Sequence, residues 1–328
     1  MNSLTPESIL KAAQSFMECR ILLTAAELDL FTLLKAAPMS AEEIAEKTGK
    51  DLRSLTMEMD ALVAMDYLVK KESSYCCDEA AGRLLASDSP VSVLPMIRHM
   101  ASLWPRWSRL TDIILNVEGA RDEFEFTRDP SELRAFIGAM HVVSGPLAKK
   151  TVAAADAGTA KRLLDVGGGS GSYTIAFLKA VPGMRATLFD LPEVIEMARE
   201  RLQEEGLLES TTLVPGNFQN QELPAGNDLA LISAIIHSNS PEQNLALYAK
   251  VFRALNPGGR ILIRDHVMEP DRAHPRSGAI FAINMLVGTE GGGTYTYEEI
   301  SKDLKVAGFE KVRLIQQGEQ MDALVEAF

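Results

Sequence analysis

The second half of the chain alternates strand-like apolar runs with segments in which apolar residues recur at helical spacing. The predicted strands are Arg162–Val166, Ala186–Asp190, Thr211–Val214, Leu229–Ile236 and Arg260–Asp265. Strands that alternate with helices of about 10–15 residues indicate a parallel sheet with helices on both faces. We therefore predict an α/β fold with a doubly wound sheet in this half.

The C-terminal end of the chain departs from that alternation. Lys311–Gln316 and Met321–Ala327 are predicted as two strands that flank a tight turn at Gly318-Glu319. Two strands joined by a tight turn form a hairpin, so the last strand should run antiparallel to the rest of the sheet.

Helix-start and helix-stop signals mark the N-terminal part. Thr5 followed by Pro6 is a good helix start, because Thr caps the first turn and Pro suits the first helical position. Ser40 with Glu43 forms a capping box before a short helix, which Gly49 ends. Together with a longer helix over Asp51–Leu68 and two short strands, these signals predict a winged helix. The strands are Val69–Lys71 and Tyr75–Cys77.

A winged helix raises the possibility of DNA binding, including a regulator that senses a cofactor. The predicted recognition helix carries four acidic residues against the single Arg53. The acidic residues are Asp51, Glu58, Asp60 and Asp66. Such a surface opposes phosphate binding. We instead expect the module to pack against a second copy of itself, which predicts a homodimer.

The segment between the two halves is predicted to be mostly helical. We expect a winged-helix dimerisation domain over residues 1–90, a helical linker over 91–150 and a cofactor domain over 151–328. Aromatic and Met residues at helical spacing are usually core, but some line apolar pockets. Trp104 and Met140 are candidates for a pocket, as is His141 beside Met140.

Composition narrows the function classes. The net charge of −12 disfavours a nucleic-acid or anionic-membrane surface, which needs clustered Lys and Arg. No apolar run approaches the roughly 20 residues that span a bilayer, and no secretory signal is evident. The three cysteines have neither a disulfide nor a zinc pattern. We expect a cytoplasmic protein with no membrane partner and no nucleic-acid partner.

A glycine-rich loop joins the first strand of the sheet to the next helix. Gly167, Gly169 and Gly171 follow Asp165, and Asp190 ends the second strand. Glycines allow a ligand to approach the backbone, the helix start presents its amides, and a carboxylate at the second strand can bind ribose hydroxyls. A dinucleotide fingerprint needs a third glycine where Ser172 stands. The spacing therefore favours S-adenosylmethionine over a nicotinamide dinucleotide.

Several stretches of the chain resemble small-molecule O-methyltransferases related to caffeate and acetylserotonin methyltransferases and to bacterial antibiotic-pathway enzymes. They are Leu163-Leu164-Asp165-Val166-Gly167-Gly168-Gly169-Ser170-Gly171, Phe189-Asp190-Leu191-Pro192, Gly216-Asn217-Phe218, Ala254-Leu255-Asn256-Pro257-Gly258-Gly259 and Ala307-Gly308-Phe309. The resemblance covers nearly the whole chain. It implies a Rossmann-like methyltransferase sheet behind a dimerisation domain.

By this resemblance, the glycine loop holds the methionine end of the cofactor, Asp190 binds the ribose and Leu191 packs on the adenine. Asn217 stands where the family usually has Asp beside the adenine, and Phe218 follows it. An Asn carbonyl can still accept a hydrogen bond from an amino group. Ser233 stands where plant members have Lys.

The same resemblance assigns catalysis to His237, which follows the fourth strand. The family's His-Asp-Trp sequence is His237-Ser238-Asn239 here, so only the histidine is kept. Asp265 occupies the position of a family Glu that flanks this histidine, and a third family Glu aligns with Thr294. The alternative for His237 is a strand-end histidine that bonds a backbone carbonyl. Asp265 could likewise only cap a turn.

The expected reaction is methyl transfer to a hydroxyl group, with His237 as proton acceptor. A phenol and a histidine differ in pKa by about 3.5 units, roughly 5 kcal/mol, and an alkyl alcohol is less acidic still. We therefore expect a phenolic or enolic hydroxyl on a small, flat, apolar molecule. The resemblance adds Phe281, Asn284 and Met285 as substrate-lining residues.

Two alternatives to O-methylation stay open at this stage. Fewer acidic residues flank His237 than flank the family's histidine. The enzyme could therefore be a relative that binds the cofactor but hydroxylates, decarboxylates or cyclises its substrate. Nitrogen, sulfur or carbon could also accept the methyl group. No cluster of Asp and His with metal-ligand spacing is evident, so we expect no metal requirement.

Overall fold

The computed structural model describes residues 4–120 and 130–328. The chain divides into two compact units, Met1–Trp104 and Pro105–Phe328, and each is described by itself. Residues 121–129 of the expected 91–150 linker lie outside the described residues, and the three-part division stays a prediction. No helix in the described ranges is long and apolar enough to cross a membrane.

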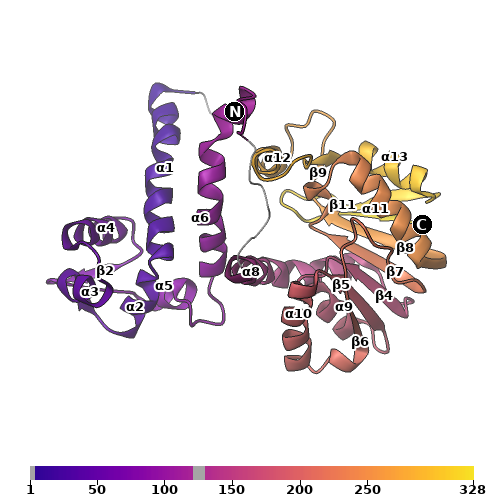
Figure 1. Cartoon of the computed structure of the whole chain (residues 1–328), viewed down its shortest axis with the longest axis horizontal. Coiled ribbons are helices and arrows are strands. Elements are labelled where there is room, and N and C mark those ends of the chain that lie inside the picture. Colours follow the sequence, from indigo (N-terminus) through magenta and orange to yellow (C-terminus); the bar gives the residue numbers. More distant parts are fainter. Residues whose placement is uncertain (1–3, 121–129) are drawn as a thin grey trace. The chain divides into compact units, whose positions relative to one another are not determined.

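A seven-stranded sheet forms the centre of the second unit (Figure 1). In spatial order its strands are β11 (Val312–Gln316), β12 (Ala323–Ala327), β8 (Leu255–Asp265), β7 (Asn227–Ser233), β4 (Arg162–Val166), β5 (Arg185–Asp190) and β6 (Thr211–Pro215). All neighbouring pairs from β8 to β6 are parallel, whereas β12 is antiparallel to both of its neighbours. The predicted doubly wound sheet with an antiparallel last strand is confirmed.

Alternate residues of the central strands bury their side chains against opposite layers of helices. Leu163 and Leu229 belong to a core with α8 (Pro130–Ala155) and α9 (Ser172–Ala180). Leu164 and Ala230 belong to a core with α11 (Pro241–Ala254) and α13 (Tyr297–Ala307). Both layers are visible in Figure 1. Because side chains alternate along a strand, a continuous apolar run serves both faces of the sheet.

The helices of the second unit connect the strands or precede the sheet. They are α7 (Leu110–Ile114), α8 (Pro130–Ala155), α9 (Ser172–Ala180), α10 (Pro192–Glu204), α11 (Pro241–Ala254), α12 (Arg276–Gly288) and α13 (Tyr297–Ala307), with short 3-10 turns η1 (Leu208–Ser210) and η2 (Ile236–Ser238). A two-stranded parallel pair, β9 (Val267–Met268) with β10 (Tyr295–Thr296), lies in the segments before α12 and α13. Helix α6 (Leu94–Ser108) contains the boundary between the units.

The first unit is built from helices and a three-stranded antiparallel sheet of order β1-β3-β2. Its elements are α1 (Pro6–Glu27), α2 (Leu30–Ala36), β1 (Met39–Ser40), α3 (Ala41–Thr48), α4 (Leu52–Ala64), β2 (Val69–Lys71), β3 (Ser74–Cys76) and α5 (Glu79–Leu85). The predicted cap of Thr5 on α1 and the capping box of Ser40 with Glu43 are present. Gly49 ends α3 in the left-handed conformation, as predicted. The winged helix that these elements suggested stays a prediction.

Several predicted boundaries were wrong, including the start of β8, which lies at Leu255 instead of Arg260. The hairpin β11–β12 is not closed at Gly318-Glu319, because residues 317–322 separate the two strands. Strand β7 ends at Ser233 instead of continuing to Ile236, since Ala234 takes a left-handed φ of +58°. Helix α4 ends at Ala64 instead of Leu68, before the left-handed Asp66.

Candidate active site

The glycine loop follows β4 at the carboxyl edge of the parallel strands. Gly167, Gly169 and Gly171 have φ values of +67°, +57° and +79°, a region that other residues rarely adopt. A Cβ atom on Gly167 would lie 2.6 Å from Cδ1 of Ile235, so a larger residue would also collide. Gly171 caps α9, and the first amides of this helix face the loop, as required for binding a polar ligand.

Asp190 ends β5, beside the glycine loop. Its Oδ2 accepts a hydrogen bond from the Gly169 amide at 2.7 Å, and its Oδ1 accepts one from the Leu191 amide at 2.7 Å. Burial raises the pKa of Asp190. A carboxylate offers about four acceptor positions, so positions remain for two ribose hydroxyls. With the 41% exposed Leu191 next to it, this arrangement fits the S-adenosylmethionine that the sequence predicted.

Asp165, also expected at the cofactor, is buried beneath the loop. Its Oδ2 accepts a hydrogen bond from Thr174 Oγ1 of α9 at 2.7 Å. Burial raises the pKa of Asp165 to about 6. A Cβ atom on Gly168 would lie 3.1 Å from its carboxyl carbon. These contacts connect β4, the glycine loop and α9.

Asn217 and Phe218 follow β6, on the other side of β5. The Asn217 Oδ1 accepts a hydrogen bond from the Gln219 amide at 2.8 Å, which fixes a turn. A Cβ atom on Gly167 would lie 3.9 Å from the Phe218 ring, so Phe218 borders the glycine loop. The structure therefore brings both residues to the edge where the cofactor was expected.

Ser233 ends β7 and accepts a hydrogen bond from Arg264, a residue that the sequence pattern did not predict at the site. The Nε of Arg264 donates to Ser233 Oγ at 2.8 Å, and the guanidinium carbon lies 5.4 Å from the centre of the Tyr173 ring. Arg264 is 4% exposed. A positive charge thus lies beside Ser233, the position at which the family resemblance implies Lys in plant members. The alternation of β8 placed Arg264 in the sheet, but no sequence signal linked it to Ser233.

His237 and Asp265 lie together, as the sequence predicted. The left-handed Ala234 ends β7, and His237 follows in the 3-10 turn η2, while Asp265 is the last residue of the neighbouring strand β8. The His237 Nδ1 lies 2.9 Å from both carboxylate oxygens of Asp265. The two residues are 8% and 1% exposed. This buried contact favours a paired histidine over one that only bonds a backbone carbonyl.

The pKa of Asp265 is lowered although the carboxyl group is fully buried. Burial acts to raise it, but the charge of His237 and its hydrogen bond outweigh burial, with smaller help from Arg264. The carboxylate is therefore ionised near neutral pH. An ionised partner holds the imidazole in one orientation and stabilises a proton added to it.

Helix α12 covers this pair with the residues expected to contact substrate. The Phe281 ring meets the His237 ring edge-on, with centroids 4.9 Å apart. Asn284 Oδ1 accepts a hydrogen bond from Trp107 Nε1 at 2.9 Å, and Met285 is buried. Thr294, at the position of a family Glu, is buried as well. The described part of the chain thus supplies one carboxylate, that of Asp265, in hydrogen-bonding contact with His237.

Three other substrate candidates lie elsewhere. His141 Nδ1 lies 2.7 Å from the hydroxyl of Ser172, so His141 is at the glycine loop. It also borders a hollow of about 220 Å³ between α8 and α10. The neighbouring Met140 is partly buried on α8. Trp104 belongs to the first unit, where Arg20 lies over its ring at 5.7 Å.

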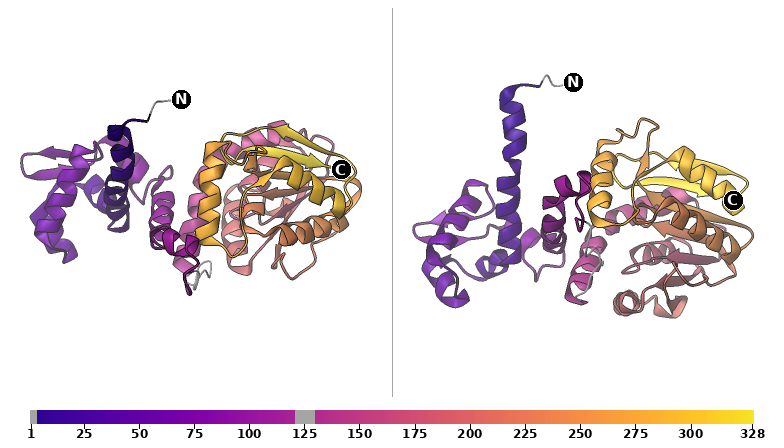
Figure 2. Two further views of the ribbon diagram at one scale, coloured as in Figure 1. Left: turned by 90° about the horizontal axis from the view of Figure 1, so that it is seen from above. Right: turned by 45° about the horizontal axis from the view of Figure 1, so that its top comes forward.

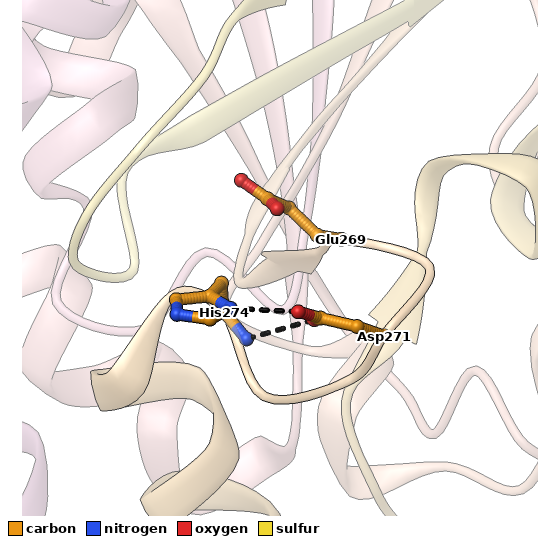
Figure 3. A group of neighbouring side chains, drawn as sticks. All are labelled: Glu269, Asp271 and His274. Carbon is orange, nitrogen blue, oxygen red and sulfur yellow. Dashed lines mark hydrogen bonds and ion pairs between the residues drawn. The ribbon is translucent and has the colours of Figure 1, made fainter.

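A second histidine–aspartate pair lies on the surface. The His274 Nδ1 is 2.7 Å from Asp271 Oδ2, and both side chains are exposed (Figure 3). With Glu269 they form a group whose possible ligand atoms lie within 4.8 Å of one another, close enough to hold a metal ion, which the sequence pattern did not predict. Exposed groups of this kind are common without a metal. Substitutions in this exposed pair are therefore matched controls for substitutions in the buried pair of His237 and Asp265.

Comparisons with known proteins show the family to which the chain belongs. The chain matches the family model of the O-methyltransferase domain over residues 110–310 and that of the O-methyltransferase dimerisation domain over residues 10–87. It is 32% identical to the tetracenomycin polyketide synthesis 8-O-methyl transferase of Streptomyces glaucescens, over 94% of this chain and 92% of that protein. It is 28% identical to the 3-hydroxy-5-methyl-1-naphthoate 3-O-methyltransferase of Streptomyces sahachiroi, over 95% and 91%.

A solved structure extends the agreement to the cofactor. The structure titled PigF with SAH superposes on the chain with a TM-score of 0.89 at 27% identity and covers 99% of both chains. SAH is the product that S-adenosylmethionine leaves after methyl transfer, so the cofactor expected from the glycine loop is confirmed. The chain belongs to the S-adenosylmethionine-dependent O-methyltransferases that carry a dimerisation domain.

Proposed function

We propose that this enzyme methylates a phenolic or enolic hydroxyl group of a small aromatic molecule, with His237 as the general base. The observation that carries the proposal is the buried contact between His237 Nδ1 and both oxygens of Asp265 at 2.9 Å. An ionised carboxylate accepts a hydrogen bond from Nδ1–H, which leaves the lone pair of Nε2 free. A histidine in this state accepts a proton at Nε2.

Asp265 has two tasks in this proposal. It fixes the tautomer of His237, and its charge stabilises the imidazolium that forms when the substrate hydroxyl loses its proton. The lowered pKa of Asp265 keeps the charge in place over the neutral range. Phe281, packed edge-on against His237, excludes water from one side of the ring.

The cofactor, when bound, supplies an electrophilic methyl group. Gly167, Gly169 and Gly171 would lie against its methionine part, and Asp190 would accept hydrogen bonds from the ribose hydroxyls. Asn217 and Phe218 would border the adenine from the β6 side. These residues and His237 belong to loops at the same edge of the sheet, so the chain can hold the methyl group and the acceptor hydroxyl in line.

Acidity and the relatives both favour a hydroxyl on an aromatic ring. A phenol requires roughly 5 kcal/mol to transfer its proton to an ordinary histidine, and an alkyl alcohol requires much more. The relative from Streptomyces sahachiroi is named for O-methylation of a hydroxynaphthoate. Phe281 and Met285 on α12 are apolar, as required for a flat apolar ring.

Methyl-labelled S-adenosylmethionine tests the proposal. We expect the wild-type enzyme to move label to the oxygen of a hydroxynaphthalene or hydroxyanthraquinone acceptor. His237→Gln should reduce turnover at least about a hundredfold while cofactor affinity stays nearly unchanged. His274→Gln, which removes an exposed histidine with its own aspartate partner, is the matched control and should retain full turnover.

Two results would overturn the proposal. Unchanged turnover in His237→Gln would dismiss His237 as the base. Label that stays in the cofactor while the acceptor is hydroxylated, decarboxylated or cyclised would assign the enzyme to non-methylating chemistry.

We further propose that the enzyme is a homodimer through its N-terminal domain. The first half of α1 exposes large apolar side chains. In Figure 2 this helix extends past α3 and α4 of its own unit. These side chains are Ile9, Leu10, Phe16 and Met17, which are 46–60% exposed. A contiguous exposed apolar surface marks an interaction site, and the dimerisation family model covers this helix from residue 10.

Analytical ultracentrifugation tests the dimer. Leu10→Glu combined with Phe16→Glu should convert the dimer to a monomer at micromolar concentration, because burying two carboxylates in an apolar interface is costly. Val306→Glu places the same charge on an exposed apolar residue of α13 and should leave the dimer intact. A wild-type protein that sediments as a monomer would contradict the proposal.

A further inference from the structure

His266 is a second buried histidine near the proposed base. It directly follows Asp265, is 5% exposed, and its backbone amide donates to Asp265 Oδ1 at 2.8 Å. Its ring nitrogen Nδ1 is buried without a hydrogen-bond partner in the described structure, which is rare for a polar atom. The chemistry proposed above gives this side chain no task.

One aromatic ring of α12 contacts both histidines. The Phe281 centroid lies 4.9 Å from that of His237 and 5.0 Å from that of His266. Phe281 is only partly buried, and it stands at the position expected to contact substrate. The two imidazoles therefore border the same part of the proposed acceptor site.

The packing of His266 indicates where its proton lies. A Cβ atom on Gly278 would lie 3.4 Å from Nδ1, so this nitrogen faces the backbone of α12. A proton on Nδ1 would be a buried donor without an acceptor, which is less tolerable than an unpaired lone pair. Nδ1 is therefore the unprotonated nitrogen and Nε2 carries the hydrogen. Burial lowers the pKa of His266, which keeps the ring neutral.

The two histidines thus present opposite hydrogen-bonding groups. His237 presents the Nε2 lone pair because Asp265 holds its Nδ1–H, whereas His266 presents an Nε2–H donor. A molecule that matches both has a hydroxyl to donate and an oxygen nearby to accept.

We propose that His266 is a specificity-determining residue that donates a hydrogen bond from Nε2 to a carbonyl oxygen of the acceptor, which makes the preferred substrate a hydroxylated aromatic ketone or quinone. The inference rests on the proposed function for the hydroxyl that faces His237. A site with a fixed polar donor discriminates strongly against an analogue without the matching oxygen. A purely structural His266 would show no such discrimination.

Calorimetry with a matched pair of ligands tests this role. The probes are 2-hydroxyanthraquinone and 2-hydroxyanthracene, which share one skeleton and one hydroxyl position, form no internal hydrogen bond and differ in the carbonyls. We expect the enzyme loaded with S-adenosylhomocysteine to bind the quinone at least about tenfold more tightly. His266→Phe keeps an aromatic ring but removes both nitrogens, so it should bind the two ligands equally. His266→Gln retains a donor and should keep part of the preference.

An unchanged preference in His266→Phe, or no preference in the wild-type enzyme, would overturn the inference. Nitrogen NMR shifts of the wild-type imidazoles provide a second test that needs no variant, because a proton on Nδ1 of His266 would also overturn it. Binding and turnover separate the two proposals. A carbonyl preference in binding without methyl transfer to either ligand would contradict the proposed function and leave the role of His266 standing.

Discussion

The two sides of the proposed active site are built in different ways. The cofactor side consists mainly of backbone: three left-handed glycines, the first amides of α9 and the amide-bonded Asp190. The acceptor side consists of side chains from separate segments, with His237 from η2, Asp265 from β8 and Phe281 from α12. A backbone site is tied to the fold and to one cofactor. A site of side chains can change its substrate while the fold persists.

Two buried aspartates, one on each side of the site, differ in the direction of their pKa shifts. Asp165 and Asp265 both end sheet strands or nearly so, and each is 1% exposed. Burial raises the pKa of Asp165 to about 6, because the hydrogen bonds from the Thr174 side chain and backbone do not offset it. The pKa of Asp265 is lowered, because His237 and Arg264 outweigh burial. The partners, and not the depth of burial, therefore decide the direction in which the pKa of each aspartate shifts.

The largest expected effect comes from Asp265→Asn on the acceptor side. Asn can donate to Nδ1 of His237 and so favour the tautomer with a proton on Nε2, which has no lone pair for the substrate. A comparable change in a serine-protease triad lowers turnover about 10⁴-fold, and we expect a loss of about 10³-fold here. Steady-state methyl transfer measures it. Asp271→Asn, in the exposed pair of Figure 3, should have no effect; an equal loss in both variants would contradict the comparison.

Gly167→Ala should disturb the cofactor side alone. Its φ of +67° strains any other residue, and the new Cβ would lie 2.6 Å from Ile235 Cδ1. Strain of about 2 kcal/mol corresponds to roughly 30-fold weaker binding of S-adenosylhomocysteine by calorimetry. Gly183→Ala is the control, because Gly183 has a φ of +80° with open space around it. Equal cofactor affinity in both variants would show that the loop is not the binding element.

The smallest expected effect is on stability. The pKa of Asp165 is about 6 in the folded state and near 3.8 when unfolded, so the folded state keeps the proton longer as pH rises. Stability from this group is therefore present at low pH and lost between about pH 4 and pH 6. Asp165→Asn removes this pH-dependent loss. The unfolding free energy of the variant minus that of the wild type should therefore increase by about 1 kcal/mol from pH 5 to pH 7. Denaturant unfolding at both pH values measures it; a constant difference would argue against a raised pKa.

The fold and the cofactor side could be predicted from the sequence because both depend on local pattern. The sequence itself shows the continuous apolar runs of strands that are buried on both faces. It also shows the glycine loop that joins a strand to a helix. The boundaries that were wrong depend on conformations that the pattern hides. Ala234-Ile235-Ile236 looks like more strand, yet the left-handed Ala234 turns the chain and places His237 beside Asp265.

The acceptor side was only partly predictable. The pairing of His237 with Asp265 came from a family resemblance, since 28 residues separate the two positions. Arg264 and His266 looked like ordinary residues at the end of a strand. Their partners, Ser233 and Phe281, are brought near by the sheet and by α12, which no local spacing reveals.

The central claim is that His237 takes the proton of the acceptor hydroxyl. Turnover of the wild-type enzyme and of His237→Gln, measured across phenols of increasing acidity, tests it most directly. A base matters less when the acceptor is already ionised, so the ratio of the two rates should fall from at least about a hundredfold for an ordinary phenol toward one for a nitrophenol. A ratio that stays constant across the series would contradict the account.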